Sequence, residues 1–194
     1  REGATLPEYF RKHGYHAEGY GKVYHHHGDG AFNDPKAWDK FRKMDPQYMP
    51  ASKLNGAKRY GSRNTDWGPW PKDEDETETI DFKSVSYAEE ALTRKQDKPF
   101  FLACGFIKPH LPFYAPKKYW DLYDRAALEL ADNRDRPLNA PSSLRGSGEI
   151  HSYHDRGMKY NSEEWHRACL HGYYACVSYV DNQIGKVMKT LDDL

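Results

Sequence analysis

The 194-residue sequence has little cysteine and no excess of charge of either sign. Its three cysteines, Cys104, Cys169 and Cys176, are odd in number and irregularly spaced, which argues against a disulfide framework, and no Cys-x-x-Cys pair indicates a zinc site. The 29 basic and 29 acidic residues give a formal net charge of zero, so bulk charge provides no basis for binding nucleic acid or an anionic membrane. No apolar run approaches the roughly 20 residues that a membrane-spanning helix needs, so we expect no membrane span.

The composition is polar but not that of a disordered chain. Hydrophobic residues make up 38% and charged residues 30%, which predicts long loops around a modest core. Aromatic residues reach 14%, and a generally disordered chain would have few of them. The first residues, REGATLPEYF, show no initiator Met and no signal-peptide pattern, so we expect a start that is processed, trimmed or internal to a longer chain.

Hydrophobic periodicity predicts helices and strands that alternate along the chain, separated by long loops. The elements expected are a helix from Thr5 to a stop at Gly14, a strand over 15–23, a helix over 80–96, a strand over 100–104, a short helix over 116–124 and a long helix from Ser162 to the end. Residues 28–80 and 125–160 are irregular and predict loops. The alternation is typical of an α/β sheet flanked by helices. Two strands do not make a stable sheet, so we expect further strands outside this sequence.

Polar side chains follow both predicted strands. Lys22 and a run of three histidines (25–27) follow the first strand, and Lys108 and His110 follow the apolar strand over 100–104, which we expect to be central and buried on both faces. Ligands of open α/β sheets bind beyond the carboxyl ends of strands. Lysine donates to anionic oxygens and histidine exchanges protons near neutral pH. The sequence therefore predicts one crevice that binds a small oxyanion such as a sulfate or phosphate ester.

Other interpretations of these histidines stay open. A run of histidines in a loop is often only solvated, and a lone histidine after a strand, such as His110, often has a structural role. A metal-binding module would need His25, His26 and His27 to converge with an acidic ligand such as Asp29, and adjacent histidines on one loop form a poor closed site.

Three segments resemble the type I sulfatases, with the iduronate-2-sulfatase-like branch the most similar. They are GYGKVYH (19–25), KPFFLACGFIKPHLPFYAPKKYWDLY (98–123) and GYYACVSYVDNQIGKVMKTLDDL (172–194). The resemblance implies an alkaline-phosphatase-like α/β fold and hydrolysis of a sulfate ester, carried by a sugar or a small alcohol. It also implies two cofactors, a formylglycine made from a cysteine and one Ca²⁺. Relatives of this kind are secreted, periplasmic or lysosomal.

The resemblance also implies roles for individual residues. Lys22 matches the lysine that binds the sulfate and the aldehyde hydrate, and His25 matches the histidine that helps to deprotonate the hydrate. His110 matches the histidine that contacts the ester and assists the leaving group. Lys108 is placed with the substrate-binding residues without a defined role. His26 and His27 match no family position.

The family motif for the nucleophile is absent from this sequence. None of the three cysteines stands in a Cys-x-Pro/Ala/Ser-x-Arg motif, and the paired aspartates that bind Ca²⁺ in the family have no match. We therefore expect residues 1–194 to be an internal portion of one sulfatase catalytic domain. The formylglycine and the Ca²⁺ ligands would then lie in the remainder of that chain, and residues 28–80 and 125–160 would be active-site loops. The alternative is a non-catalytic fragment or degenerate homologue that acts as a binding or structural module.

Overall fold

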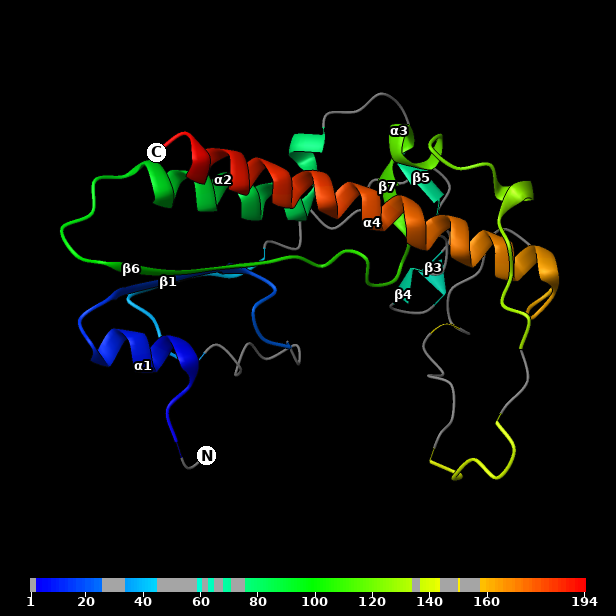
Figure 1. Ribbon diagram of the computed structural model, residues 1–194, viewed down its shortest axis with the longest axis horizontal. Helices are drawn as coiled ribbons and strands as arrows, with labels where there is room; N and C mark the ends of the chain where they lie inside the picture. The colour runs from blue at the N-terminus through cyan, green and yellow to red at the C-terminus, as the bar shows by residue number, and fades with distance from the viewer. Residues whose placement is uncertain are drawn as a thin grey trace. The chain divides into compact units, whose positions relative to one another are not determined.

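The computed structural model describes residues 3–25, 34–44, 59–60, 63–64, 68–70, 76–133, 137–143, 150 and 158–194 (Figure 1). These residues belong to two compact units. The first comprises Arg1–Met49, Asp75–Ile107 and Val180–Leu194, and the second comprises Pro50–Glu74 and Lys108–Tyr179. Much of the predicted loops over 28–80 and 125–160 lies outside the described residues, so their role as active-site loops stays a prediction.

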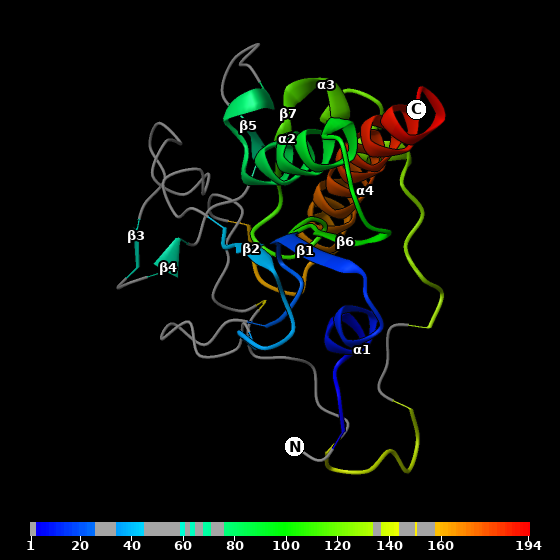
Figure 2. The ribbon, with the colours of Figure 1, turned by 90° about the vertical axis from the view of Figure 1, so that its left-hand side faces the viewer.

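The first unit is built on a parallel sheet of three strands in the order β2-β1-β6 (Figure 2). The central strand β1 covers His16–Gly21, and its neighbours are β2 (Lys40–Arg42) and β6 (Phe100–Gly105). The register pairs His16 with Phe100 and Gly21 with Gly105. The two longer strands therefore begin and end together, which brings the residues that follow them to the same edge of the sheet.

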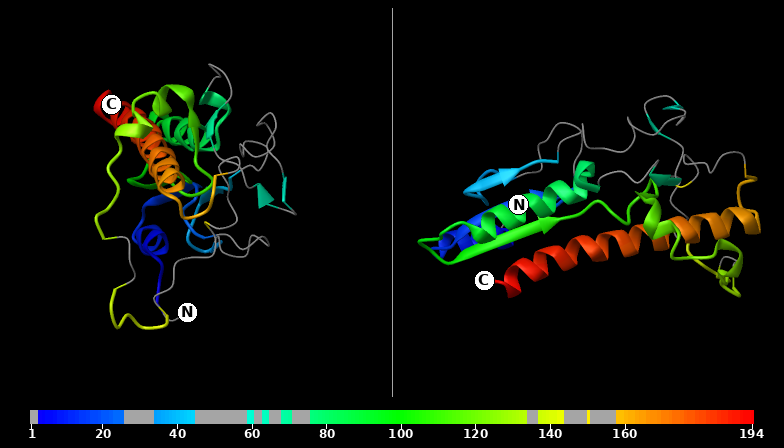
Figure 3. Two further views of the ribbon diagram at one scale, coloured as in Figure 1. Left: turned by 90° about the vertical axis from the view of Figure 1, so that its right-hand side faces the viewer. Right: turned by 90° about the horizontal axis from the view of Figure 1, so that it is seen from above.

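Two helices lie on opposite faces of this sheet, α1 (Leu6–Lys12) and α2 (Ile80–Thr93) (Figures 1 and 2). Alternate residues of a strand point to opposite faces, and the contacts follow that period. On one face Phe10 of α1 stacks on Phe101 at 4.8 Å, and on the other Tyr20 contacts Tyr87 of α2 at 5.6 Å between ring centroids. Seen from above, α2 runs along β6 (Figure 3).

A buried carboxylate joins the sheet to α2. Glu18, only 3% exposed, accepts hydrogen bonds from the Tyr20 hydroxyl and the Arg94 guanidinium, and its Oε1 lies 2.7 Å from His16 Nε2. Burial acts to raise the pKa of Glu18. The hydrogen bonds from Tyr20 and His16 and the positive charges of Arg94 and Lys40 outweigh that effect, so the pKa lies below the usual value.

The second unit combines short strands with the first part of a long helix. Strands β5 (Gly68–Trp70) and β7 (Tyr114–Pro116) pair in parallel, and β3 (Arg59–Tyr60) pairs antiparallel with β4 (Arg63–Asn64). Helical residues follow β7 in α3 (Lys117–Trp120) and η4 (Arg125–Ala127). Helix α4 (Glu163–Asp192) contributes residues up to Tyr179 to this unit, and its later residues, together with η3 (Glu76–Glu78), belong to the first unit.

Aromatic residues form the core of the second unit. The buried cluster consists of Phe113, Tyr114, Ala115, Tyr119, Trp120, Trp165, Ala175, Cys176 and Tyr179. The members from α4 recur at helical spacing. Gly172 permits the close approach of the helix, because a Cβ at that position would lie 2.8 Å from Phe113 Cβ.

The structure confirms most of the predicted elements. The helix near the N-terminus, α2, the short helix after Pro116 and the long final helix all form, and Ser162 caps α4 by accepting the Trp165 N–H at 3.1 Å. The three cysteines are free thiols, as expected. Among the described helices, none is long and apolar enough to cross a membrane.

Two strand predictions were wrong. The pattern predicted a loop over 28–80, but β2, β3, β4 and β5 form within it, at residues 40–42, 59–60, 63–64 and 68–70. Strand β6, which was expected to be central and fully buried, lies at the edge of the described sheet, and its residues are half-buried or, at Phe100, exposed. The buried central strand is β1, since it has a neighbour on both sides.

Candidate functional site

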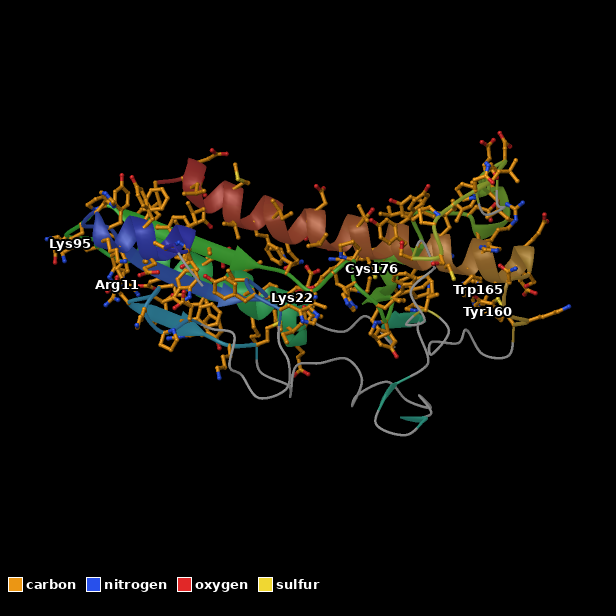
Figure 4. All side chains as sticks on the ribbon, turned by 90° about the horizontal axis from the view of Figure 1, so that it is seen from below. Arg11, Lys22, Lys95, Tyr160, Trp165 and Cys176 are labelled. Carbon is orange, nitrogen blue, oxygen red and sulfur yellow. The ribbon has the colours of Figure 1, made fainter. Side chains whose placement is uncertain are left out.

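Lys22 stands directly after β1, at the carboxyl end of the central strand (Figure 4). Its backbone N–H donates to the carbonyl oxygen of Gly105, the last residue of β6, over 3.1 Å. The pairing of the two strands thus continues one residue beyond β1 and fixes the backbone from which the Lys22 side chain extends. His25 follows three residues later and is exposed.

Glycines at the ends of both strands make this approach possible. Gly21 has a φ of +73°, and a Cβ there would lie 2.1 Å from the Gly105 carbonyl oxygen. A Cβ at Gly105 would lie 2.3 Å from the carbonyl carbon of Lys22 and 2.7 Å from Val23 N. All three distances are far below van der Waals contact, so a larger residue in place of Gly21 or Gly105 would force the ends of the two strands to move.

A buried aspartate holds the chain as it leaves β6. Asp81, in the first turn of α2, is 1% exposed, and its Oδ1 accepts the Ile107 N–H at 2.7 Å. A charge-assisted hydrogen bond of this kind is stronger than a neutral one. Asp81 therefore fixes the position of the backbone immediately before Lys108.

The turn that carries His110 is held by hydrogen bonds from the Lys108 side chain to two backbone carbonyls. Lys108 is 7% exposed, and its Nζ donates to the carbonyl oxygen of Pro112 over 2.5 Å and to that of His110 over 3.4 Å. The ammonium group also lies 5.6 Å from the centre of the Tyr114 ring. The Lys108–Pro109 and Leu111–Pro112 peptide bonds are cis.

The imidazole of His110 has a defined orientation. Its Nδ1 lies 2.6 Å from the carbonyl oxygen of Leu111. A carbonyl oxygen only accepts, so Nδ1 carries the proton of this hydrogen bond. The other ring nitrogen, Nε2, is then the atom that accepts or donates a proton elsewhere, and the residue is exposed. This is the arrangement that a general acid or base requires.

The predicted site residues divide between the two units. Lys22 and His25 belong to the first unit and Lys108 and His110 to the second, and their meeting in one crevice stays a prediction. His26, His27 and Asp29 lie outside the described residues. The interpretation of the histidine run as a metal-binding module therefore stays untested. In the part of the chain that the structure describes, no three His, Cys, Asp or Glu side chains form a group that could hold a metal ion.

The chemistry of Cys104 does not suit a nucleophile. Burial, with a further contribution from the negative charge of Asp81, raises the pKa of the Cys104 thiol to about 12. The thiol therefore stays protonated at neutral pH, and its Sγ donates to the Ser84 carbonyl at 3.5 Å.

An open groove of about 460 Å³ lies at the opposite end of the strands, beside the start of β1. It is lined by Glu8, Arg11, Lys12, Gly14, Tyr15, His16, Lys36, Asp39 and Lys98. Its two carboxylates are paired, Glu8 with Lys12 at 2.6 Å and Asp39 with Arg11 at 2.9 Å. None of the buried polar atoms that lack a partner in the described residues lines this groove. The groove therefore shows no built ligand site.

Sequence reasoning missed two residues that position this site, Asp81 and Gly105. Gly105 could have been found from its place in the Cys-Gly-Phe segment, since a glycine at the end of a strand often marks a close backbone approach. No local sequence signal indicates that Asp81 binds the backbone after β6, because an aspartate in the first turn of a helix is ordinarily explained by the helix dipole.

The comparisons with known proteins point to one family. The family model described as Sulfatase matches residues 1–194. A sulfatase from Formosa agariphila is 34% identical over 196 residues, which cover 96% of this chain and 38% of that protein. Human iduronate 2-sulfatase is 28% identical over 219 residues, which cover 98% of this chain and 37% of that protein. The chain thus spans somewhat more than a third of the length of these relatives.

A solved structure shows the same fold. The phosphonate monoester hydrolase of Agrobacterium radiobacter superposes with a TM-score of 0.61 at 19% identity, covering 98% of this chain and 44% of that one. The α/β arrangement of parallel strands and helices is therefore part of an alkaline-phosphatase-like fold, as expected. A sulfatase segment is favoured over the alternative of a non-catalytic fragment or degenerate homologue that acts as a binding or structural module, because the family match covers every residue from 1 to 194 and the relatives are named sulfatases. With the Gly-Lys-x-x-His and Lys-Pro-His segments placed after β1 and β6, the chain belongs to the sulfatase family.

Proposed function

We propose that the complete protein hydrolyses sulfate esters and that this chain supplies Lys22, His25 and His110 to the reaction. The observation that carries the proposal is the position of Lys22 at the carboxyl end of the central strand, with its backbone bonded to Gly105. Ligands of open α/β sheets bind at this edge. A sulfated sugar or a small sulfated alcohol is the proposed substrate, in keeping with the name of the human relative.

Each residue has a role that follows from its chemistry. The fixed ammonium of Lys22 stabilises negative charge on the sulfuryl oxygens as the S–O bond breaks. His25 holds or transfers a proton beside it. In its imidazolium form, His110 donates Nδ1–H to the Leu111 carbonyl and transfers the proton of Nε2 to the oxygen of the departing alcohol. The alcohol needs that proton because an alkoxide is a poor leaving group.

The proposed reaction also uses a formylglycine and a Ca²⁺ ion. No residue of this chain is assigned as the formylglycine or as a ligand of Ca²⁺. A formylglycine would supply the nucleophile and Ca²⁺ would supply further positive charge. Cys104 does not fit the precursor of a formylglycine, since its thiol is protonated and the Arg of the family motif does not follow it. Among the described residues no group of three His, Cys, Asp or Glu side chains could hold a metal ion. The proposal assigns both groups to other parts of the complete protein because this sequence lacks the family motifs for them.

The test is sulfate release by the complete protein. An aryl sulfate and a series of sulfated monosaccharides are the substrates, and a phosphate monoester serves as a comparison. We expect Lys22→Ala to reduce turnover by roughly 10²–10³-fold, the usual effect of removing one transition-state donor. Lys95→Ala, which removes an exposed lysine before β6, is the matched control and should leave turnover unchanged. The proposal fails if the unmodified protein releases no sulfate from any ester, or if the two variants behave alike.

A further inference from the structure

We propose that Lys108 is a positioning residue that orients His110 and does not bind the substrate sulfate. The inference rests on the proposed function, because the role it assigns is to place the acid of that reaction. It concerns the four-residue turn from Lys108 to Leu111 and the residue after it, Pro112, all within the second unit.

Three successive carbonyl groups of this turn have alternating partners. The carbonyls of His110 and Pro112 accept from the Lys108 ammonium at 3.4 and 2.5 Å. The carbonyl between them, that of Leu111, accepts from His110 Nδ1 at 2.6 Å. Because the lysine holds the two outer carbonyls on one side, the middle carbonyl is directed to the imidazole. The ammonium group therefore sets the orientation of the catalytic histidine through the backbone.

Hydrogen bonds also connect this turn to the core of the second unit. The carbonyl of Pro112 also accepts the Tyr114 N–H at 3.0 Å, and the carbonyl of Tyr114 accepts from Cys176 Sγ of α4 at 3.4 Å. Tyr114 is 2% exposed and Cys176 is fully buried. Lys108 thus connects the exposed imidazole of His110 to the buried core of the second unit.

A lysine suits this position for physical reasons. Its ammonium group is compact and has three donors, of which two serve the carbonyls of the turn. The aliphatic part of the side chain can be buried beside the ring of Tyr114, whose face attracts the positive charge. If the ammonium group of the buried Lys108 turned towards a sulfate instead, its two hydrogen bonds to the turn would be lost.

The first experiment is a double-mutant cycle in the complete protein, using Lys108→Met, His110→Ala and the double variant. Substrates with a poor leaving group (a sugar sulfate) and a good one (nitrophenyl sulfate) are compared. We expect Lys108→Met to reduce turnover of the sugar sulfate by roughly 10–100-fold, because a misplaced catalytic group loses up to about 10²-fold. Nitrophenyl sulfate should change by less than about 3-fold, since it hardly needs the acid.

The double variant distinguishes a Lys108 that acts through His110 from a Lys108 that acts independently of it. If Lys108 acts through His110, the double variant is no slower than His110→Ala alone on the sugar sulfate. If the two losses multiply, or if Lys108→Met raises KM equally for both substrates, Lys108 acts independently and the inference is wrong. Lys118→Met is the matched control, because Lys118 is an exposed lysine of the same unit. Lys108→Gln, which retains N–H donors, replaces Lys108→Met if that variant does not fold.

A second measurement does not depend on activity. Nitrogen-15 NMR of the histidine side chains, with the His110 signals assigned by their loss in His110→Ala, reports which ring nitrogen carries the proton. We expect the Nδ1–H form for neutral His110 in the unmodified protein and in Lys118→Met, and a mixture of both forms in Lys108→Met. An unchanged His110 spectrum in Lys108→Met overturns the inference. A changed spectrum in a protein without sulfatase activity would support the positioning role while the proposed function fails.

Discussion

The backbone N–H of Lys22, directly after β1, donates to the carbonyl oxygen of Gly105, the last residue of β6, over 3.1 Å. A Cβ at Gly105 would come within 2.3 Å of the Lys22 carbonyl carbon, so this contact exists only because residue 105 is glycine. The position of the proposed sulfate-binding lysine therefore depends on a residue that takes no part in the chemistry.

Gly105→Ala in the complete protein should damage both stability and turnover. We expect the free energy of unfolding to fall by about 1–3 kcal/mol, since the extra methyl overpacks the strand ends. Turnover of an aryl sulfate should fall by roughly 10²-fold, because the Lys22 backbone must move. Thermal unfolding and sulfate release measure the two effects.

Gly185→Ala is the control for that substitution. Gly185 lies within α4, and a Cβ there would meet no atom within 4 Å. The change should raise the stability by about 0.5–1 kcal/mol, because alanine is the better helix former, and leave turnover unchanged. Equal effects of the two glycine substitutions on turnover would contradict the role given to Gly105.

His110→Ala should affect substrates according to their leaving groups. We expect turnover of a sugar sulfate to fall by about 10²–10⁴-fold and turnover of nitrophenyl sulfate much less, because only the alkoxide needs a proton. Lys22→Ala should lower both by similar factors, since both substrates share the sulfuryl group. Equal losses on both substrates for His110→Ala, with a lower melting temperature, would show a structural role instead.

The isolated 194-residue chain should release no sulfate from nitrophenyl sulfate. None of its three cysteines stands in the family's nucleophile motif, and the Cys104 thiol is protonated at neutral pH. The measurement compares the purified chain with its His110→Ala variant. Turnover above that variant would show that the chain carries a nucleophile of its own.

Glu18→Gln should weaken the fold at neutral pH. The folded-state pKa of Glu18 lies below its unfolded value, so its ionised form stabilises the fold above the unfolded pKa. That stabilisation is lost as the pH falls through the folded-state pKa. We expect Glu18→Gln to lower the free energy of unfolding by about 1.5–3 kcal/mol at pH 7, the usual value for a hydrogen bond to a charged group.

Urea unfolding of the complete protein at pH 7 and at about pH 3 tests this dependence. The difference between the unmodified protein and Glu18→Gln should shrink at the lower pH, where the carboxylate becomes protonated. Glu129→Gln, at an exposed position, should change the stability by less than about 0.5 kcal/mol at either pH. A Glu18→Gln difference that stays constant across this range would contradict the lowered pKa.

Cys104 should resist alkylation in the folded protein. With its pKa raised to about 12, the thiolate fraction at pH 8 is roughly a thousandfold below that of an ordinary cysteine. Mass spectrometry after treatment with iodoacetamide at pH 8 should find Cys104 unmodified in the folded protein and modified in urea. Comparable modification of Cys104 in the folded protein and in urea would contradict the raised pKa of its thiol.

The sequence by itself determined the local elements and indicated which residues are candidates for the site. The 3.6-residue periodicity of α4 and the N-cap at Ser162 are local features, so they could be predicted without the structure. The same holds for Lys22 and His110, because each follows an apolar or glycine-rich strand within a short recognisable segment.

Tertiary structure decided the sheet and the direction of the buried side chains. Strand β2 has three residues, too few for a periodic pattern, and it forms because β1 offers it a partner. The edge position of β6 depends on which strands lie beside it and not on its own apolar run. The Lys108 ammonium turns to the carbonyls of residues 110 and 112 because the folded turn brings those oxygens within its reach. Contacts between distant or folded-back segments carry no periodic signal along the chain, and only the packed structure fixes them.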